Sequence, residues 1–285
     1  MEQISLQETD GFLSDKYSIT VDKIKTSYKE WFALVQKINC LIYDMYTNFD
    51  VKNNDTIGMY LIDSFAKSHK SFQACSILYS YGLDDDVCII FRTMLESLFV
   101  ASSIKKDSNN FNKLLKNQEI ENTIETNHLI KDGVIKDKKI QSVNFDEKTS
   151  IYNFAKLSDY EEMYNTAYSY LSSYVHIDLN ALAKNFIFKK QKVYSICISP
   201  SADDLCFILT EAVGLMLAYI DIVKDYLIKD YTIELDNLKK KVEIYNEIKS
   251  FLLKKDSKLE EAIKEKWGIR ILNQEFYETL ISFII

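Results

Sequence analysis

Apolar residues recur every three or four positions through most of the chain, which is the period of helices that bury one face. The pattern predicts long helices over 17–48, 56–81, 84–105, 160–176 and 201–229, and a more polar helix over 108–125. The helix over 84–105 is apolar nearly all round, so we expect it at the centre of a helical bundle.

Breaks in the period mark the ends of these elements. Gly82 follows the second long helix, at the position where a glycine commonly ends a helix, and Asp84 to Asp86 place acid at the favourable start of the next one. Residues 127–150 lose the period and indicate a polar surface loop or a partly mobile insertion. β-Branched and aromatic residues between Phe186 and Ser199, just before Pro200, indicate a short strand.

Apolar residues return after Thr232 at heptad-like spacing: Leu235, Leu238, Val242, Tyr245 and Leu252. We therefore predict an all-α fold, with a helical bundle over 1–229 and a helical C-terminal extension over 230–285. The last residues, 280–285, are almost entirely apolar. A chain end of this kind docks on its own domain or on a partner, so we expect a homo-oligomer or a partner protein at the C-terminal region.

Composition narrows the protein class. Six glycines and one proline among 285 residues argue against a β-sandwich or a doubly wound sheet. The net charge of −7 argues against a broad nucleic-acid-binding surface, but it allows a local basic patch. The five cysteines lack metal-ligand spacing, the N-terminus lacks the pattern of a signal peptide, and the apolar stretch 207–223 falls short of a membrane span. We expect a cytoplasmic protein without a membrane segment.

Two charges interrupt the most apolar helix. Arg92, one of two arginines in the chain, and Glu96 are the only charged residues between Val87 and Ile104, and their spacing of four places them on one face. Buried charge must be paired, so these residues form either an ion pair that fixes how the helix packs or part of a functional site.

Polar residues also gather around His176. Ser172 lies four positions before it, and Tyr174 lies between them. The histidine is either a core residue satisfied by its neighbours or a general base, because its ordinary pKa is near neutrality. Lys189 and Lys190 belong to a lysine-rich stretch that either attracts phosphate or forms a solvated face. The three histidines are too scattered for a metal site, and no phosphate-binding loop or other cofactor motif occurs, so we predict neither metal nor cofactor.

Two passages resemble the signatures of a bacterial all-helical family of unknown function. The first is the acid-started helix that continues with Arg-Thr-Met-Leu-Glu over 92–96, and the second is Leu-Ser-Ser-Tyr-Val-His over 171–176. The resemblance covers roughly 64–182 and leaves out the first helix and the tail. More remotely, the chain resembles the HEPN superfamily of helical nucleotide-binding domains and ribonucleases, which commonly act as dimeric RNA-cleaving toxins or antiphage effectors.

The HEPN resemblance implies a metal-independent ribonuclease in which His176 assists attack by a ribose 2′-hydroxyl. The HEPN hallmark places an arginine five to seven residues before the histidine, but Leu171, Tyr170 and Ser169 occupy those positions here. Arg92 would have to substitute from another helix, with Glu96 orienting it. Ser172, Tyr174, Lys189 and Lys190 would then contact RNA or a nucleotide. The alternative is a non-enzymatic sensor or scaffold in which Arg92, Glu96 and His176 form a buried structural network.

Overall fold

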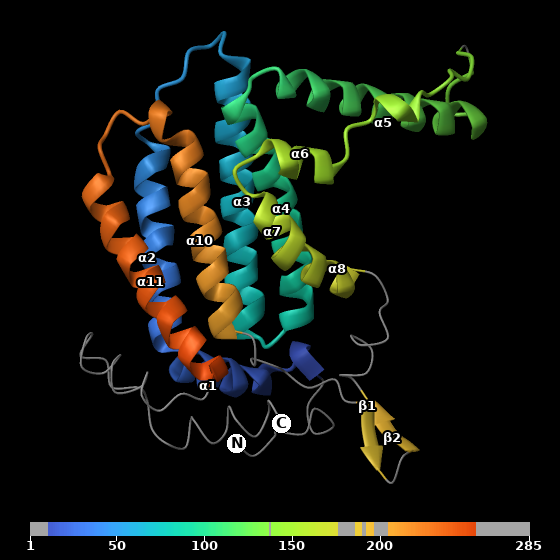
Figure 1. Cartoon of the computed structure of the whole chain (residues 1–285). Coiled ribbons are helices and arrows are strands. Elements are labelled where there is room, and N and C mark those ends of the chain that lie inside the picture. The colour runs from blue at the N-terminus through green and yellow to red at the C-terminus, as the bar shows by residue number, and fades with distance from the viewer. Residues whose placement is uncertain (1–10, 137, 176–185, 190–191, 197–204, 255–285) are drawn as a thin grey trace.

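The computed structural model is a bundle of α-helices, as the sequence predicts (Figure 1). It describes residues 11–136, 138–175, 186–189, 192–196 and 205–254. The α-helices are α1 (Ser18–Ser27), α2 (Lys29–Tyr46), α3 (Thr56–Ser80), α4 (Asp84–Lys106), α5 (Asn110–Lys131), α6 (Ile151–Leu157), α7 (Glu161–Met163), α8 (Ser169–Val175), α10 (Leu205–Val223) and α11 (Thr232–Lys254).

Helices α4 and α10 form the centre of the bundle. Helix α10 contacts α2, α3, α4 and α11, while α4 is covered by α3, α10, α6 and α8. Tyr219 of α10 is fully buried, and its hydroxyl lies 3.4 Å from that of Ser64, which lies 3.0 Å from that of Ser97. Among the described helices, α4 alone is long and apolar enough to cross a membrane, and 67% of that apolar window is buried inside the protein.

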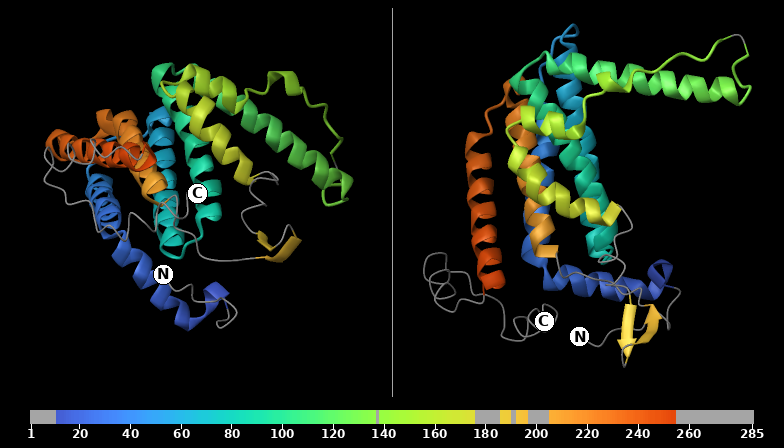
Figure 2. Two further views of the ribbon diagram at one scale, coloured as in Figure 1. Left: turned by 60° about the horizontal axis from the view of Figure 1, so that its bottom comes forward. Right: turned by 45° about the vertical axis from the view of Figure 1, so that its right-hand side comes forward.

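The prediction of one continuous helix over 17–48 is wrong, because the structure has two helices there, α1 and α2. Tyr28 has φ −114° and ψ 28°, which interrupts the helix, so that α1 lies across one end of the bundle while α2 runs along it (Figure 2). The buried ring of Tyr28 packs edge-on against Trp31, with the centroids 6.3 Å apart. The hydroxyl of Tyr17 donates a hydrogen bond of 2.6 Å to the carbonyl of Tyr81, which anchors α1 at the end of α3.

Gly82 ends α3 as predicted. Its φ of 68° lies in the left-handed region, where a residue without Cβ is favoured. The amide of Gly82 donates to the carbonyl of Tyr79, and that of Leu83 donates to Leu78, which together close the helix end. The chain can then reverse directly into α4.

The opposite end of the bundle is closed by two loops that pair with each other. Phe49 forms an isolated antiparallel bridge with Leu227, and the amide of Asp50 donates a 2.8 Å hydrogen bond to the carbonyl of Tyr226. Asp44 accepts from Lys229 at 2.6 Å and from the hydroxyl of Tyr231 at 2.9 Å. These contacts tie the α2–α3 connection to the chain between α10 and α11.

Gly58 makes this loop pairing sterically possible. A Cβ at Gly58 would lie 2.6 Å from the carboxylate of Asp55, 2.7 Å from the ring of Tyr226 and 2.8 Å from a methyl of Val51. We expect Gly58→Ala to lower the free energy of unfolding by about 1–3 kcal/mol, the usual range for overpacking. Gly214→Ala is the matched control, because a Cβ there meets nothing within 4 Å. Denaturant unfolding of both variants measures the difference; equal stabilities would contradict the steric argument.

Residues 107–150 form a projecting arm rather than a short polar helix followed by a loop (Figure 1). Helix α5 continues to Lys131, six residues beyond the predicted end. Gly133, with φ 75°, then closes it through hydrogen bonds from its own amide to Ile130 and from Val134 to Leu129. The chain returns alongside α5, so the predicted loop is an ordered second side of the arm where it is described.

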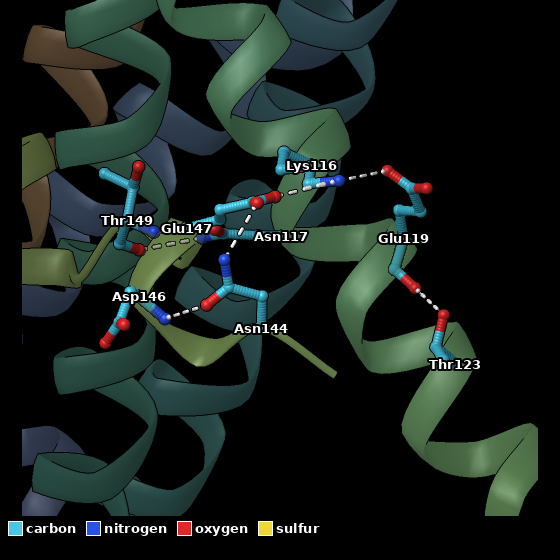
Figure 3. Close-up of polar contacts among 8 residues, drawn as sticks. All are labelled: Lys116, Asn117, Glu119, Thr123, Asn144, Asp146, Glu147 and Thr149. Carbon is cyan, nitrogen blue, oxygen red and sulfur yellow. Dashed lines mark hydrogen bonds and ion pairs between the residues drawn. The ribbon is translucent and has the colours of Figure 1, made fainter. Parts of the chain in front are cut away.

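Two asparagines clamp the returning segment to α5. The amide side chain of Asn117 both donates to the carbonyl and accepts from the backbone amide of Thr149, each at 2.8 Å. Asn127 holds Gln141 in the same way, also at 2.8 Å in both directions. Figure 3 shows the first clamp beside Lys116, which lies 3.0 Å from a carboxylate oxygen of both Glu119 and Glu147. Polar side chains, not an apolar core, therefore order the arm.

Three other predicted boundaries also change. The predicted helix 160–176 is divided into α7, a π-helical turn over Tyr164–Tyr168 and α8, and its final residue, His176, lies outside the described residues. The predicted single strand is a hairpin of β1 (Phe186–Lys189) and β2 (Lys192–Ile196). The predicted helix 201–229 ends at Val223, before a short 3-10 turn. Helix α11 packs on α10 and α2, and residues 255–285 of the predicted extension lie outside the described residues.

Candidate functional site

Arg92 and Glu96 form an ion pair on the side of α4 that faces α8. Nη2 of Arg92 lies 3.1 Å from Oε1 of Glu96, and the two side chains are 21% and 26% exposed. The spacing of four on one helix brings them together, as the sequence predicts. They lie at the edge of the core, so the guanidinium is neither fully buried nor free in solvent.

Tyr168 completes this pair. Its hydroxyl accepts a 2.7 Å hydrogen bond from Nη2 of Arg92 and donates one of 2.8 Å to Oε1 of Glu96. The guanidinium carbon also lies 4.8 Å from the centre of the tyrosine ring, within the range of a cation–π contact. The hydroxyl of Tyr168 therefore forms hydrogen bonds with both charged side chains of the ion pair.

Ser172 fixes the other edge of the guanidinium. Its hydroxyl accepts from Nε of Arg92 at 3.2 Å and donates to the backbone carbonyl of Tyr168 at 2.8 Å. Ser172 lies one helical turn after Tyr168, so both groups meet the same arginine. We call Arg92, Glu96, Tyr168 and Ser172 the arginine cluster.

The π-helical turn sets the direction of Tyr168. The rings of Tyr164 and Tyr168, at the two ends of this turn, stack with their centroids 4.7 Å apart and their planes at 18°. Phe99 of α4 packs against both rings. Single π-turns inside helices are rare and often occur at functional sites. Here the wider turn allows Tyr168 to reach α4 while Leu171 remains in the core.

The electrostatics keep Tyr168 protonated. The pKa of its phenol is raised to about 12, first by burial and then by the neighbouring carboxylate of Glu96, while Arg92 acts in the opposite direction. A phenol with this pKa keeps its proton throughout the neutral range, and it donates a hydrogen bond to Glu96. The cluster is thus a fixed hydrogen-bond relay from Arg92 through Tyr168 to Glu96.

The third nitrogen of the guanidinium, Nη1, differs from the other two. Nε and Nη2 make the contacts given above, whereas no described residue accepts a hydrogen bond from Nη1. A guanidinium held at Nε and Nη2, with its Nη1 edge without an acceptor among the described residues, has lost much of its rotational freedom. Such an edge can bind a phosphate or carboxylate oxygen without first being ordered.

The other predicted site residues are placed differently or lie outside the described part. Tyr174 is half-buried, and its hydroxyl lies 2.7 Å from that of Tyr170; about 200° of helical rotation separates it from Ser172. Lys189 ends β1, but its side chain is not described, and His176 and Lys190 lie outside the described residues. Of the predicted set, the structure brings together Arg92, Glu96 and Ser172.

A second polar network joins α2 and α3 around His69, which is 1% exposed. Nε2 of His69 lies 2.9 Å from Oδ1 of Asn39, which also accepts from Gln73 at 2.8 Å, so Nε2 carries the proton. Nδ1 then accepts from the hydroxyl of Tyr46 at 2.7 Å. Burial lowers the pKa of His69 to about 4, so the ring is neutral at pH 7. This network satisfies a buried side chain, and we assign it a structural role.

Within the described residues, no group of three or more His, Cys, Asp or Glu side chains is arranged to hold a metal ion. The arginine cluster combines a positioned cation, a carboxylate that pairs with it and two hydroxyls. It can bind and orient an anion.

The chain was compared with protein families, curated proteins and solved structures. No curated protein and no solved structure matches the chain. The segment that a family model matches contains helices α4 to α8 and strand β1, and with them the whole arginine cluster. Helix α3 begins two residues before this segment and β2 ends three residues beyond it, whereas α2, α10 and α11 fall outside it. That segment, residues 58–193, matches the sequence model of DUF5677, a family of unknown function.

Proposed function

We propose that this protein is a cytoplasmic, RNA-directed effector of bacterial antiphage defence, with metal-independent ribonuclease or toxin activity. Its substrate contact is the outward edge of Arg92, which meets a phosphodiester oxygen. The single observation that supports this role is that Nε and Nη2 of Arg92 are held by Ser172, Tyr168 and Glu96, while Nη1 has no acceptor among the described residues.

In the proposed reaction, His176 removes the proton of a ribose 2′-hydroxyl, which attacks the adjacent phosphorus. The bond from phosphorus to the 5′-oxygen breaks, and that oxygen takes up a proton from water, which leaves a 2′,3′-cyclic phosphate on one product and a 5′-hydroxyl on the other. Arg92 stabilises the charge that develops on the phosphorane oxygens. Lys189 and Lys190 add positive charge along the RNA, and Tyr174 lines the approach.

Glu96, Tyr168 and Ser172 act through Arg92 in this proposal. A free arginine side chain loses rotamer entropy when it binds, and a pre-positioned one has already lost it. Glu96 also lowers the net charge of the cluster, which weakens binding of anions in general. The site then favours an anion whose geometry matches the open edge over any anion that only seeks positive charge.

The second candidate function is a non-enzymatic sensor or scaffold. It is favoured by the ion pair itself, because Arg92 and Glu96 satisfy each other and join α4 to α8 through Tyr168 and Ser172. A half-buried hydrogen-bond network of this kind fixes helix packing without any ligand. Under this reading the C-terminal region carries a partner protein or a second copy.

The test compares three full-length variants by RNA cleavage, toxicity in cells and thermal unfolding. We expect Arg92→Lys, which keeps the charge but loses the planar fork, to lower cleavage about 10²-fold or more. His176→Ala should lower it by about 10²–10⁴-fold, the usual effect of losing a general base. Tyr168→Phe keeps the ring and the arginine but removes two hydrogen bonds, so cleavage should fall less than in Arg92→Lys.

The products and the stabilities separate the two candidates. Cleavage that leaves 2′,3′-cyclic phosphate ends and continues in EDTA supports the proposed mechanism. Folded and fully active Arg92→Lys and His176→Ala variants would show that neither residue is catalytic. A wild-type protein that leaves RNA intact and is not toxic, with Arg92→Lys changing only the melting temperature, would establish the scaffold reading instead.

A further inference from the structure

The arm has little support from the rest of the protein. Helix α5 is about 33 Å long at 1.5 Å per residue, yet only Asn110 and Ile120 of its side chains are buried. Figures 1 and 2 show α5 and the returning segment extending away from the bundle. Isolated helices and hairpins are marginal in water, so a projecting arm of this length gains stability from a docking partner.

The arm also carries exposed apolar side chains at two places. The tip, residues 128–140, exposes Val134 by 69%, Ile140 by 54% and Leu129 by 36%. The middle, residues 116–125 and 144–149, exposes Phe145 by 62%. Scattered exposed apolar residues are ordinary on a protein surface, but these lie on one element that has no core of its own.

The tip and the middle of the arm also differ in charge. The tip contains four lysines against two aspartates, and none of Lys131, Lys136, Lys138 and Lys139 forms an ion pair with a described residue. The middle contains five acids against two lysines, and both lysines already pair with acids of the middle. The tip is therefore basic and the middle acidic.

From this distribution we infer that the arm is a self-complementary dimerisation element that binds the arm of a second copy of this chain. The two arms lie antiparallel, with the basic tip of each on the acidic middle of the other. A two-fold arrangement repeats the favourable tip-to-middle contact twice. It also brings the apolar side chains of the tip against Phe145 of the partner arm. The nearly balanced charge of the arm argues against a nucleic acid as the occupant.

Charge reversal tests this pairing in the full-length protein. The tip variant is Lys138→Glu with Lys139→Glu. The middle variant is Glu125→Lys with Asp146→Lys, chosen because neither acid forms an ion pair with a described residue, so the clamps within the arm stay intact. We expect each variant alone to dimerise at least about tenfold more weakly than wild type at low salt. Lys67→Glu with Lys70→Glu, two exposed residues of α3, makes the same charge change away from the arm and should dimerise like wild type.

Mixing the two arm variants is the decisive measurement. Each homodimer opposes like charges, whereas the mixed pair restores a basic surface against an acidic one at both contacts. Sedimentation of the equimolar mixture should recover wild-type affinity, and added salt should weaken it. A monomeric wild type at tens of micromolar (above ordinary homodimer dissociation constants), arm variants that dimerise as well as wild type, or a mixture that stays monomeric would each overturn the inference.

Discussion

Phe65→Ala is expected to lower the free energy of unfolding by about 4 kcal/mol, in the range measured for buried phenylalanines. Phe65 is fully buried in α3, where its ring contacts Tyr46 and Phe49 from α2 and the following loop, and Tyr219 from α10. Truncation leaves a cavity at a junction of three elements, and rigid aromatic neighbours cannot easily collapse into it.

Thermal unfolding measures this effect. For a protein of this size the loss corresponds to a melting temperature lower by roughly 10 °C. Ile77→Ala, also in α3 but 60% exposed, should change stability by about 0.5 kcal/mol or less. A Phe65→Ala variant that melts within two or three degrees of Ile77→Ala would mean that the three elements do not meet at this ring.

His69 should make the protein sensitive to mild acid. Burial lowers its pKa from the ordinary 6.5 to about 4, so between these pH values the unfolded chain binds a proton that the folded protein does not. Stability therefore falls as the pH falls from about 6.5 to 4. At about 1.4 kcal/mol per pKa unit, the loss reaches about 3 kcal/mol by pH 4.

His69→Gln is the matched variant, because its amide can donate and accept hydrogen bonds but does not titrate. We expect it to be less stable than wild type at pH 7 but to lose less stability between pH 6.5 and 4.5. Carboxylates with lowered pKa, such as Asp44 beside Lys229 and Asp225 beside Lys105, affect both proteins alike. Parallel stability curves for the two proteins would show that His69 is not buried in its neutral form.

The helices could be predicted where burial and helical period coincide. Helices α3 and α4 lie nearly where the apolar period puts them, and Gly82 ends α3 for the predicted reason. The break at Tyr28 leaves no such signal, because Ile24, Trp31 and Ile38 keep the helical spacing across it. Packing of α1 across the end of the bundle decides that break, and packing is a property of the whole fold.

The arm shows the reverse case, in which a real element has no apolar period. Helix α5 is held by asparagine clamps, and the residues that form each clamp are far apart in sequence, as Asn117 and Thr149 are. Side chain-to-backbone pairs of this kind leave no pattern, since any returning segment offers the same amide and carbonyl. The sequence therefore predicted a polar helix only over 108–125 and a loop over 127–150, and it gave no sign that the two segments pair.

The candidate site was partly predictable for a related reason. Two charges in an apolar helix identify Arg92 and Glu96, and small polar residues point to Ser172. Tyr168 was missed, because a regular helix places Tyr164, Leu171 and Tyr174 on the inner stripe. The π-turn widens the helix just before α8 and turns Tyr168 toward α4. Only its spacing of four from Ser172 could have suggested that the two share a face.

The clamped arm also affects how this chain should be compared with its relatives across evolution. The arm leaves the end of α4 and returns to the start of α6, and α4 and α6 pack on each other, so the arm can lengthen, shorten or disappear without moving any helix of the bundle. Relatives with quite different lengths between the arginine pair and Tyr168 could therefore preserve the same cluster. Alignments are best anchored on 84–106 and 151–175, and gaps between these two blocks should carry no penalty.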